Sequence, residues 1–555
     1  MFEMDLQDLN LITKPARYIG SEVNIIRKDW KSAKLKVALC FPETYELGMS
    51  NLGIRIIYGV INAHQDYLAE RVFAPERDLE KMLRENGSFL TSLESRRPLF
   101  EFDLLGVTLA GELSYSNFLT VLSLGGIPLR NIERSREHPI ILAGGSGAFT
   151  PEPMADFCDA FFVGEGEEAI LDILQVLTEN KGRNREERLM ALSKLPGIYV
   201  PAFYKPQYNA SGVYQGLEVQ RKGVPEKVKR VVVTNFEEAP FPKRWLVPYL
   251  SIVHDRIGIE IMRGCVHRCQ FCQARIIYSP CRLRSPRKIF TLVKESLAMT
   301  GYEEVSLLSL SSGDYPNLEE LQKILEPYCR LKTVKISFPS LRADTLVLSA
   351  ARVEKGKKQP ALTFAPESSE RLRLLLGKEM RDKDLLSQAQ QAREAGWTRL
   401  KLYFMLGLPG ETEDDLREIV RLIRELSRIL FLNLSFNTFI PKPHTPLERC
   451  GMANREEIGE KKMFLQKSFN NRRYISLRFR SYGQSLLEIL LARGDRRMSS
   501  VILGAWEKGA RFDGWDDHPY FNLWEEALKE SGFNTEEMTG VLPENSVVPW
   551  SHIVV

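Results

Sequence analysis

The sequence predicts an α/β protein in which a doubly wound parallel sheet precedes a partial barrel of six β/α units. Three observations support this prediction. Short apolar segments alternate with amphipathic helix patterns over residues 34–178, and the same alternation returns from Gly258 onward. A polar or glycine-rich motif also follows almost every predicted strand. Such alternation favours parallel sheets, which carry functional loops at the carboxyl ends of their strands.

The chain divides into five predicted parts. Its 555 residues leave room for three to four domains of about 150 residues each. The parts are an N-terminal extension (1–33), the doubly wound α/β domain (34–178), a linker with a small β-rich insert (179–255), the partial TIM barrel (256–449) and an α-rich C-terminal region (450–555).

The composition indicates a globular protein of a reducing compartment. Hydrophobic residues make up 44% and charged residues 27% of the chain, and the net charge of +4 is too small to indicate nucleic-acid binding by itself. Eight cysteines are few, and only three of them cluster. The acidic N-terminus resembles no signal peptide, and no run of about 18 apolar residues is present. We therefore expect a cytoplasmic protein without a membrane segment.

Three cysteines follow an apolar strand pattern at Ile259–Met262. Cys265, Cys269 and Cys272 have the spacing C-x3-C-x2-C. Thiolates suit iron–sulfur clusters and zinc, and three thiolates leave one iron of a cubane open. A structural zinc ion would need a fourth ligand, which His267 or Cys281 could supply. No second pair of cysteines follows, so the spacing favours iron–sulfur, with His267 as a loop or substrate-facing residue.

The cysteine spacing, with the aromatic Phe271 before the third cysteine, resembles the radical SAM superfamily. The resemblance implies a 4Fe–4S cluster whose open iron chelates S-adenosylmethionine. It also implies reductive cleavage to a 5′-deoxyadenosyl radical, with an electron donor such as flavodoxin or ferredoxin as partner.

The strand-end motifs of the barrel resemble the S-adenosylmethionine contacts of that superfamily. Its G-G-E-like motif corresponds here to Ser312–Asp314, a departure that keeps a carboxylate on a shorter side chain. The phrase GLPGET contains glycines that let the backbone approach adenine. Any one polar residue after a strand could equally be a helix N-cap. The implied contacts are Ser312, Gly313, Asp314, Ser337, Ser340, Arg342, Glu367, Gly407 and Gly410.

The first domain resembles the Rossmann-like cobalamin-binding domain of one large radical SAM class. The resemblance rests on GGSG, PEP and VGEGEE, and it implies cofactor contacts at Gly144, Gly145, Gly164, Glu165 and Gly166. The loop PETYELGMSNLG lacks the histidine of the motif D-x-H-x-x-G, so no histidine of that loop would hold cobalt. Two interpretations stay open: cobalamin binds without this ligand, or the glycine-rich loops are tight turns of a domain that has lost the cofactor.

The order of motifs along nearly the whole chain resembles a radical SAM subgroup with an N-terminal cobalamin-binding-type domain, in which RGDRR and RFDGW recur. It implies a radical SAM enzyme that performs cobalamin-dependent methyl transfer on a substrate that the sequence does not identify. One alternative is cobalamin-free, methylthiotransferase-like modification of RNA or protein. An alternative of another class is a zinc-stabilised nucleic-acid-binding protein.

Two groups of basic residues are compatible with RNA, but solvated or structural arginines are the favoured interpretation. Similar proteins often continue beyond the last residue of this chain, so a partner carrying a C-terminal extension is a further expectation. The basic groups are Arg275, Arg282, Arg284, Arg287 and Lys288, and Arg472, Arg473, Arg478 and Arg480.

Overall fold

A doubly wound sheet forms the N-terminal half, as the sequence predicts. The computed structural model describes residues 10–242, 244–338, 362–470, 473–515 and 520–555. The strand order is β2-β1-β3-β4-β5-β6, and only β6 runs antiparallel to its neighbour. The strands are β1 (Leu35–Phe41), β2 (Tyr67–Phe73), β3 (Leu104–Thr108), β4 (Ile140–Gly144), β5 (Ala160–Phe162) and β6 (Ile198–Tyr199).

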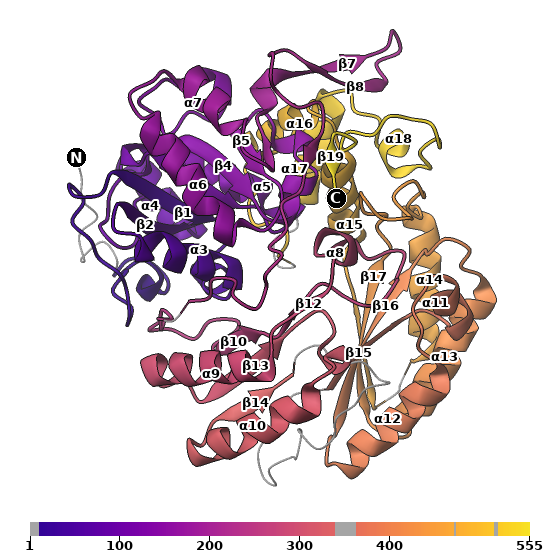
Figure 1. Cartoon of the computed structure of the whole chain (residues 1–555). Helices are drawn as coiled ribbons and strands as arrows, with labels where there is room; N and C mark the ends of the chain where they lie inside the picture. The colour runs from indigo at the N-terminus through magenta and orange to yellow at the C-terminus, as the bar shows by residue number, and fades with distance from the viewer. Residues whose placement is uncertain (1–9, 243, 339–361, 471–472, 516–519) are drawn as a thin grey trace.

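Helices cover both faces of this sheet (Figure 1). The strand order reverses between β1 and β3, and this switch point opens a crevice at the carboxyl ends of the strands. The helices are α2 (Tyr45–Gly48), α3 (Leu52–Ala63), α4 (Arg77–Glu85), α5 (Tyr115–Leu124), α6 (Gly166–Glu179) and α7 (Arg185–Leu192). The last helix and β6 lie in the stretch predicted as a linker, and β6 completes the sheet.

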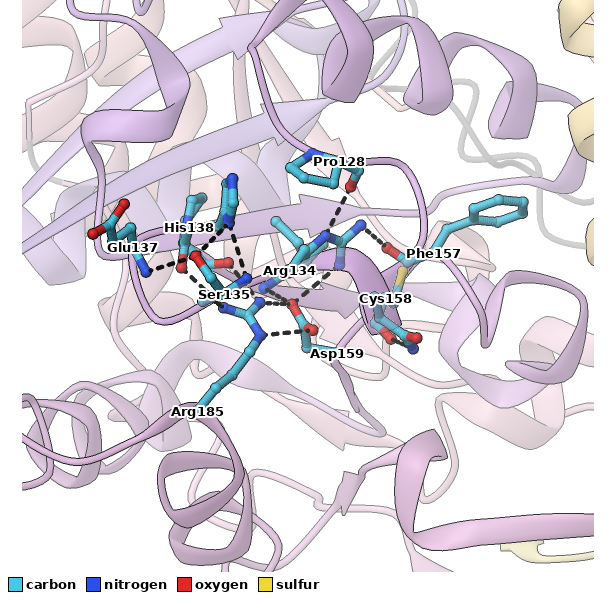
Figure 2. Close-up of polar contacts among 12 residues, drawn as sticks. Pro128, Arg134, Ser135, Glu137, His138, Phe157, Cys158, Asp159 and Arg185 are labelled. Atoms are coloured by element: carbon cyan, nitrogen blue, oxygen red, sulfur yellow. Dashed lines mark hydrogen bonds and ion pairs between the residues drawn. The ribbon is translucent and has the colours of Figure 1, made fainter.

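A buried ion network holds the opposite edge of the same sheet (Figure 2). The Asp159 carboxylate, just before β5, accepts from Arg134 at 3.1 Å, from Arg185 at 2.6 Å and from the Ile141 amide at 2.7 Å. Both guanidinium groups also donate to loop carbonyls, including those of Pro128 and His138. This network ties the amino ends of β4 and β5 together, away from the functional edge.

The second half contains the predicted barrel strands in two parallel sheets, β10-β13-β14 and β15-β16-β17-β18. No pairing joins the two sheets among the described residues, so the barrel is open as predicted. The sequence analysis did not anticipate β18, which adds a seventh strand. The strands are β10 (Ile257–Glu260), β13 (Glu304–Leu308), β14 (Lys335–Ser337), β15 (Leu362–Glu367), β16 (Arg399–Leu406), β17 (Phe431–Thr438) and β18 (Ile475–Phe479).

Alternation along the strands separates a covered face from an inner face. In β16, Leu400, Leu402 and Phe404 are buried against the outer helices, while Lys401 and Tyr403 point to the inner face. The outer layer holds α9 (Pro286–Thr300), α10 (Leu318–Leu331), α12 (Asp382–Glu394), α13 (Glu413–Ser427) and α14 (Arg455–Ser468), and α11 (Glu370–Leu375) follows β15.

The C-terminal helices pack into the core of the N-terminal domain as well as against the barrel. Val501 and Ile502 share one hydrophobic cluster with Phe118 of α5. The Asp513 carboxylate accepts from Ser116 at 2.5 Å and from the Trp524 indole at 2.8 Å. The motif RFDGW therefore fastens this region to the first domain. The helices are α15 (Tyr482–Arg493), α16 (Met498–Glu507), α17 (Phe521–Glu530) and α18 (Thr535–Thr539).

Two short pairings follow the doubly wound sheet. A hairpin of β7 (Tyr204–Tyr208) and β8 (Tyr214–Val219) follows β6, as the sequence predicts for a β-rich insert. Strand β9 (Val228–Lys229) pairs with β19 (Ile553–Val554), so the chain end returns to the insert. Among the described residues, no helix has the length and apolarity needed to cross a bilayer.

His552, beside β19, makes the stability of this junction depend on pH. It lies buried against Tyr199, near Glu152, Arg496 and His444, and burial lowers its pKa to about 4. Between about pH 6.5 and pH 4, His552 binds a proton in the unfolded chain but not in the folded chain. The free energy of unfolding therefore keeps its full contribution from His552 above about pH 6.5 and loses it as the pH falls toward 4. This single shift, from 6.5 to about 4, corresponds to about 3 kcal/mol of stability.

We expect His552→Phe to remove this slope, because phenylalanine binds no proton while its ring can keep the packing on Tyr199. The measurement is urea denaturation at several pH values between 4 and 7. His64→Phe is the control, since His64 is exposed and stacks on Tyr67. Equal slopes in wild type and His552→Phe would contradict the assignment.

Candidate cofactor site

The three cysteines lie in a loop between β11 (Met262–Arg263) and α8 (Gln273–Ile277), at the carboxyl end of the first barrel strand. Gly264 starts this loop with φ +88°, and a Cβ there would stand 2.8 Å from the carbonyl oxygens of Tyr278 and Pro280. Only glycine lets the loop return so closely upon itself. Strand β12 (Arg282–Leu283) closes the return by pairing with β11.

Contacts with the segment after β15 shape the cysteine loop. The Gln270 amide donates to the Leu376 carbonyl at 2.9 Å. Gly377 has φ +75°, and a Cβ there would meet the Arg268 carbonyl at 2.7 Å. Phe271 packs against a small cluster that includes Leu372 and Phe439. These contacts hold the cysteine loop against the segment that follows β15.

All three thiols are half-buried at this loop. No group of three histidine, cysteine or carboxylate side chains in the described part of the chain is gathered closely enough to hold one metal ion. A cubane does not need such a group, because each thiolate binds a different iron at a different corner. Three thiolates on one loop, in the spacing C-x3-C-x2-C, are a donor set that suits an iron–sulfur cluster.

Asp314 lies beside the cysteine loop, and its predicted contact with S-adenosylmethionine stays a prediction. Its carboxylate contacts the His267 Nε2 at 2.7 Å and accepts from the Ser311 hydroxyl. Ser312 is buried, and its hydroxyl contacts Ser309 at 3.0 Å and the Leu307 carbonyl at 3.2 Å. The Asp314 carboxylate therefore faces the cysteine loop, whereas the Ser312 hydroxyl bonds within its own strand-end loop.

The other predicted S-adenosylmethionine contacts are only partly described. The Ser337 hydroxyl donates to Glu304 at 2.8 Å, and Ser340 and Arg342 lie outside the described residues. Glu367 has φ +68° and pairs with Lys378 at 2.8 Å. A binding role for each of these residues stays a prediction.

The GLPGET loop is held by its own glutamate. Gly407 and Gly410 both have positive φ, +80° and +76°. The Glu411 carboxylate accepts from the Gly407 amide at 2.9 Å and pairs with Lys461 at 2.5 Å. Burial raises the pKa of Glu411. A Cβ at Gly407 would stand 2.6 Å from the Ala453 side chain, whereas one at Gly410 would meet no atom within 4 Å. The adenine contact at these glycines stays a prediction.

The two predicted glycine-rich loops of the first domain differ in their surroundings. Gly145 has φ +88° and packs on Leu109, and the next residues, Ser146 and Gly147, line a cavity. Gly164 packs on Val231 instead. Gly144 and Gly166 have no such close contacts. The predicted cofactor contacts at these glycines remain untested.

Glu165, in the second of these loops, connects the two halves of the protein. Its carboxylate accepts from both terminal nitrogens of Arg282 at 2.6 Å and from the Val233 amide at 2.7 Å. Arg282 is thereby a structural arginine, as the sequence analysis favoured.

A cavity of about 420 Å³ joins the first domain to the cysteine loop. Its walls come from the loops after β1 and β3, which flank the switch point, and from Gln273 directly after Cys272. Lys442 lines the cavity and pairs with Glu112 and Glu488, both at 2.8 Å. This triad fastens the barrel, the first domain and α15 around one chamber.

Two family models match the chain. One, described as "Radical SAM proteins, N-terminal", matches residues 53–201, and the other, "Radical SAM superfamily", matches residues 259–423. The second range begins in β10 and includes all three cysteines. The chain belongs to the radical SAM superfamily. It is therefore an enzyme of the kind that uses a 4Fe–4S cluster and S-adenosylmethionine, and the zinc-stabilised binding protein is set aside.

Relatives of this radical SAM chain fall into two groups. "Uncharacterized protein MJ0966" of Methanocaldococcus jannaschii is 27% identical over 84% of this chain and 90% of its own length. The ribosomal protein uS12 methylthiotransferase RimO of Thermodesulfovibrio yellowstonii is 28% identical, and the tRNA-2-methylthio-N(6)-dimethylallyladenosine synthase of Clostridium novyi 26%. Each of these two matches covers only 30% of this chain, and 41% and 39% of the relative.

A solved structure shares the overall fold of the radical SAM chain. It is the radical S-adenosylmethionine methyltransferase TsrM from Kitasatospora setae with cobalamin and a 4Fe–4S cluster bound. The match covers 89% of this chain and 99% of TsrM, with a TM-score of 0.52 and 12% identity. The predicted order of a doubly wound domain before a partial barrel is therefore confirmed.

Sequence reasoning missed the residues of the chamber that come from the switch point. Glu43, in the loop after β1, accepts from Asn117 and from the Trp515 indole, both at 3.3 Å. Burial raises the pKa of Glu43 to about 7. The signal available in the sequence was that Glu43 lies in the loop after the first strand. The order of the strands in the sheet places that loop at the edge where such folds bind ligands.

Proposed function

We propose that this radical SAM enzyme transfers a methyl group with the help of cobalamin, bound at the edge of the doubly wound sheet that opens into the 420 Å³ chamber between its halves. The observation that carries the proposal is the make-up of this chamber. The carboxyl edge of the doubly wound sheet faces Gln273, the residue after Cys272, across one cavity. A cofactor at the switch point would therefore lie beside the cluster loop.

Cys265, Cys269 and Cys272 would hold the cluster, which when bound supplies the electron that cleaves S-adenosylmethionine. Asp314 would accept a hydrogen bond from the amino group of S-adenosylmethionine, since its carboxylate stands beside the loop and is oriented by His267 at 2.7 Å. The Glu411-supported GLPGET backbone would lie along the adenine. The chain's own contribution is to orient and enclose these groups.

A cofactor that reaches into the chamber would meet no histidine among the described lining residues. Gly111 lines the chamber, and a Cβ added there would meet no atom within 4 Å. Bound cobalamin would supply the methyl group. No histidine among the described residues of the chamber lining would bind its cobalt.

The experiment is anaerobic reconstitution followed by iron, sulfide and cobalt analysis and a S-adenosylmethionine cleavage assay under dithionite. We expect about four irons per chain, 5′-deoxyadenosine or a methylated product, and stoichiometric cobalamin. Labelling the protein's histidines with nitrogen-15 should leave the electron paramagnetic resonance spectrum of bound cob(II)alamin unchanged. Cluster and cleavage without cobalamin uptake would refute the cobalamin part alone.

The RimO-like relatives favour a second candidate, cobalamin-free methylthiolation. Enzymes of that kind normally carry a second cluster on three upstream cysteines. Upstream of Cys265 the sequence has only Cys40 and Cys158, and both are buried. Iron well above four per chain, with a methylthiolated product, would support this candidate over methyl transfer.

A further inference from the structure

The base of the cysteine loop is the short antiparallel ladder of β11 and β12. The three cysteines and α8 all lie between these two strands, within residues 264–281. In the register of the ladder, Met262 stands opposite Leu283 and Arg263 stands opposite Arg282. Two arginines therefore form the last rung before the loop opens, one at each end of the loop.

The first domain binds both arginines of this rung through the loop after β5. Arg282 donates to the two carboxylate oxygens of Glu165, both at 2.6 Å. Arg263 donates to Glu167 at 2.5 Å and lies 3.4 Å from the Glu165 carboxylate. Two bonds from an arginine fork to one carboxylate fix direction as well as distance. Two carboxylates of another domain therefore hold the base of the cysteine loop.

These ion pairs are buried between the two halves of the protein. The side chains of Glu165, Glu167, Arg282 and Arg263 are 6%, 7%, 9% and 11% exposed. Acidic residues at the start of a helix such as α6 often serve only the helix dipole. Glu165 makes no side-chain cap bond to that helix, and its carboxylate accepts from the Val233 amide at 2.7 Å as well as from Arg282. Both carboxylates therefore act across the interface.

Arg282 extends this anchor to the loop itself. Its Nε donates to the Pro280 carbonyl at 3.0 Å, and a terminal nitrogen donates to the Tyr278 carbonyl at 3.2 Å. A Cβ at Gly264 would stand 2.8 Å from the same two carbonyl oxygens, so the outgoing limb of the loop lies against the returning limb there. The guanidinium that Glu165 orients thus holds the two limbs at the point where they meet.

We propose that Glu165 and Glu167 are positioning residues for the cluster, which hold the cysteine loop closed and fixed to the first domain through the two arginines. All three thiolates lie on this loop, so its path decides where they meet the irons. Groups that orient metal ligands without touching the metal commonly change its affinity and reduction potential. The inference deepens the proposed function and rests on it, because it makes the first domain a support of the cluster loop as well as the site of a cofactor.

The test measures how fast bathophenanthroline disulfonate, an iron chelator, removes the cluster from the reconstituted full-length protein without cobalamin. We expect Glu165→Gln to lose iron about tenfold faster than wild type. Glu167→Gln should have a smaller effect, because Arg263 keeps its bonds to Glu260 at 2.9 and 2.8 Å. The midpoint potential of the cluster should rise in Glu165→Gln, since a negative charge beside the loop opposes reduction.

A double variant, Glu165→Gln with Arg282→Gln, tests the contact without leaving a buried arginine unpaired. Because both residues act through one contact, its iron loss should equal that of Glu165→Gln rather than exceed it. Its midpoint potential should return toward the wild-type value, since the pair has no net charge before or after substitution. Iron loss as slow as in wild type would show that the contact does not hold the loop.

Asp159→Asn is the matched control, because Asp159 is also a buried carboxylate shared by two arginines but lies at the amino edge of the sheet. It should lower stability and leave the rate of iron loss and the midpoint potential at the wild-type values. Equal acceleration in Asp159→Asn, or wild-type rates in every Glu165 variant, would overturn the inference. Cobalamin uptake and methyl transfer are measured in separate samples, so their failure would contradict the proposed function without changing this result.

Discussion

Cys269→Ala is expected to abolish both cluster assembly and S-adenosylmethionine cleavage. A cubane left with two protein thiolates loses a corner ligand, and the side chain that the substitution removes is small and half-buried. The measurements are iron and sulfide content, the visible absorption of the cluster and 5′-deoxyadenosine after dithionite reduction. Circular dichroism should match the wild type.

Cys281→Ala is the matched control for this prediction. Cys281 directly precedes β12 and is not part of the C-x3-C-x2-C spacing. Burial raises the pKa of the Cys281 thiol, and the charge of the nearby Cys265 raises it further. We expect this variant to retain about four irons and S-adenosylmethionine cleavage. If Cys281→Ala lost the cluster while Cys269→Ala kept it, the ligand assignment would be wrong.

Asp159→Asn is expected to lower the free energy of unfolding by about 3–5 kcal/mol. The substitution keeps the shape of the side chain but leaves Arg134, whose side chain is 0% exposed, and Arg185, 12% exposed, without their shared carboxylate. An uncompensated buried guanidinium is far more costly than a lost surface pair. The measurement is the urea midpoint of the first unfolding transition.

Glu137→Gln is the control in the same loop (Figure 2). Glu137 is exposed, so its neutralisation should change stability by less than about 0.5 kcal/mol. An Asp159→Asn variant as stable as Glu137→Gln would show that the network does not hold β4 and β5 together. Because the network lies at the amino edge of the sheet, cobalamin binding should survive in any Asp159 variant that remains folded.

Local patterns determined much of the barrel in advance. Alternating apolar segments indicate strands such as Arg399–Leu406 because side chains on a strand alternate between faces, and parallel connection places Asp314 and Gly407 at the same edge as the cysteines. The cysteine spacing is a purely local signal, so it could be read without the fold. Strand β18 was not predicted, because its sequence ISLRF alternates half-buried apolar residues with exposed polar ones and follows a basic stretch.

The sequence by itself determined the family, the cysteine loop and the order of the two α/β halves. Only the tertiary structure decided that Arg496 binds the buried Glu152 at 3.1 Å and that RFDGW anchors to Ser116, contacts between residues more than 300 positions apart. Only the strand order showed which loops flank the switch point and so placed Glu43 at the chamber. Such pairings depend on how whole elements pack, and no short-range pattern of residues encodes them.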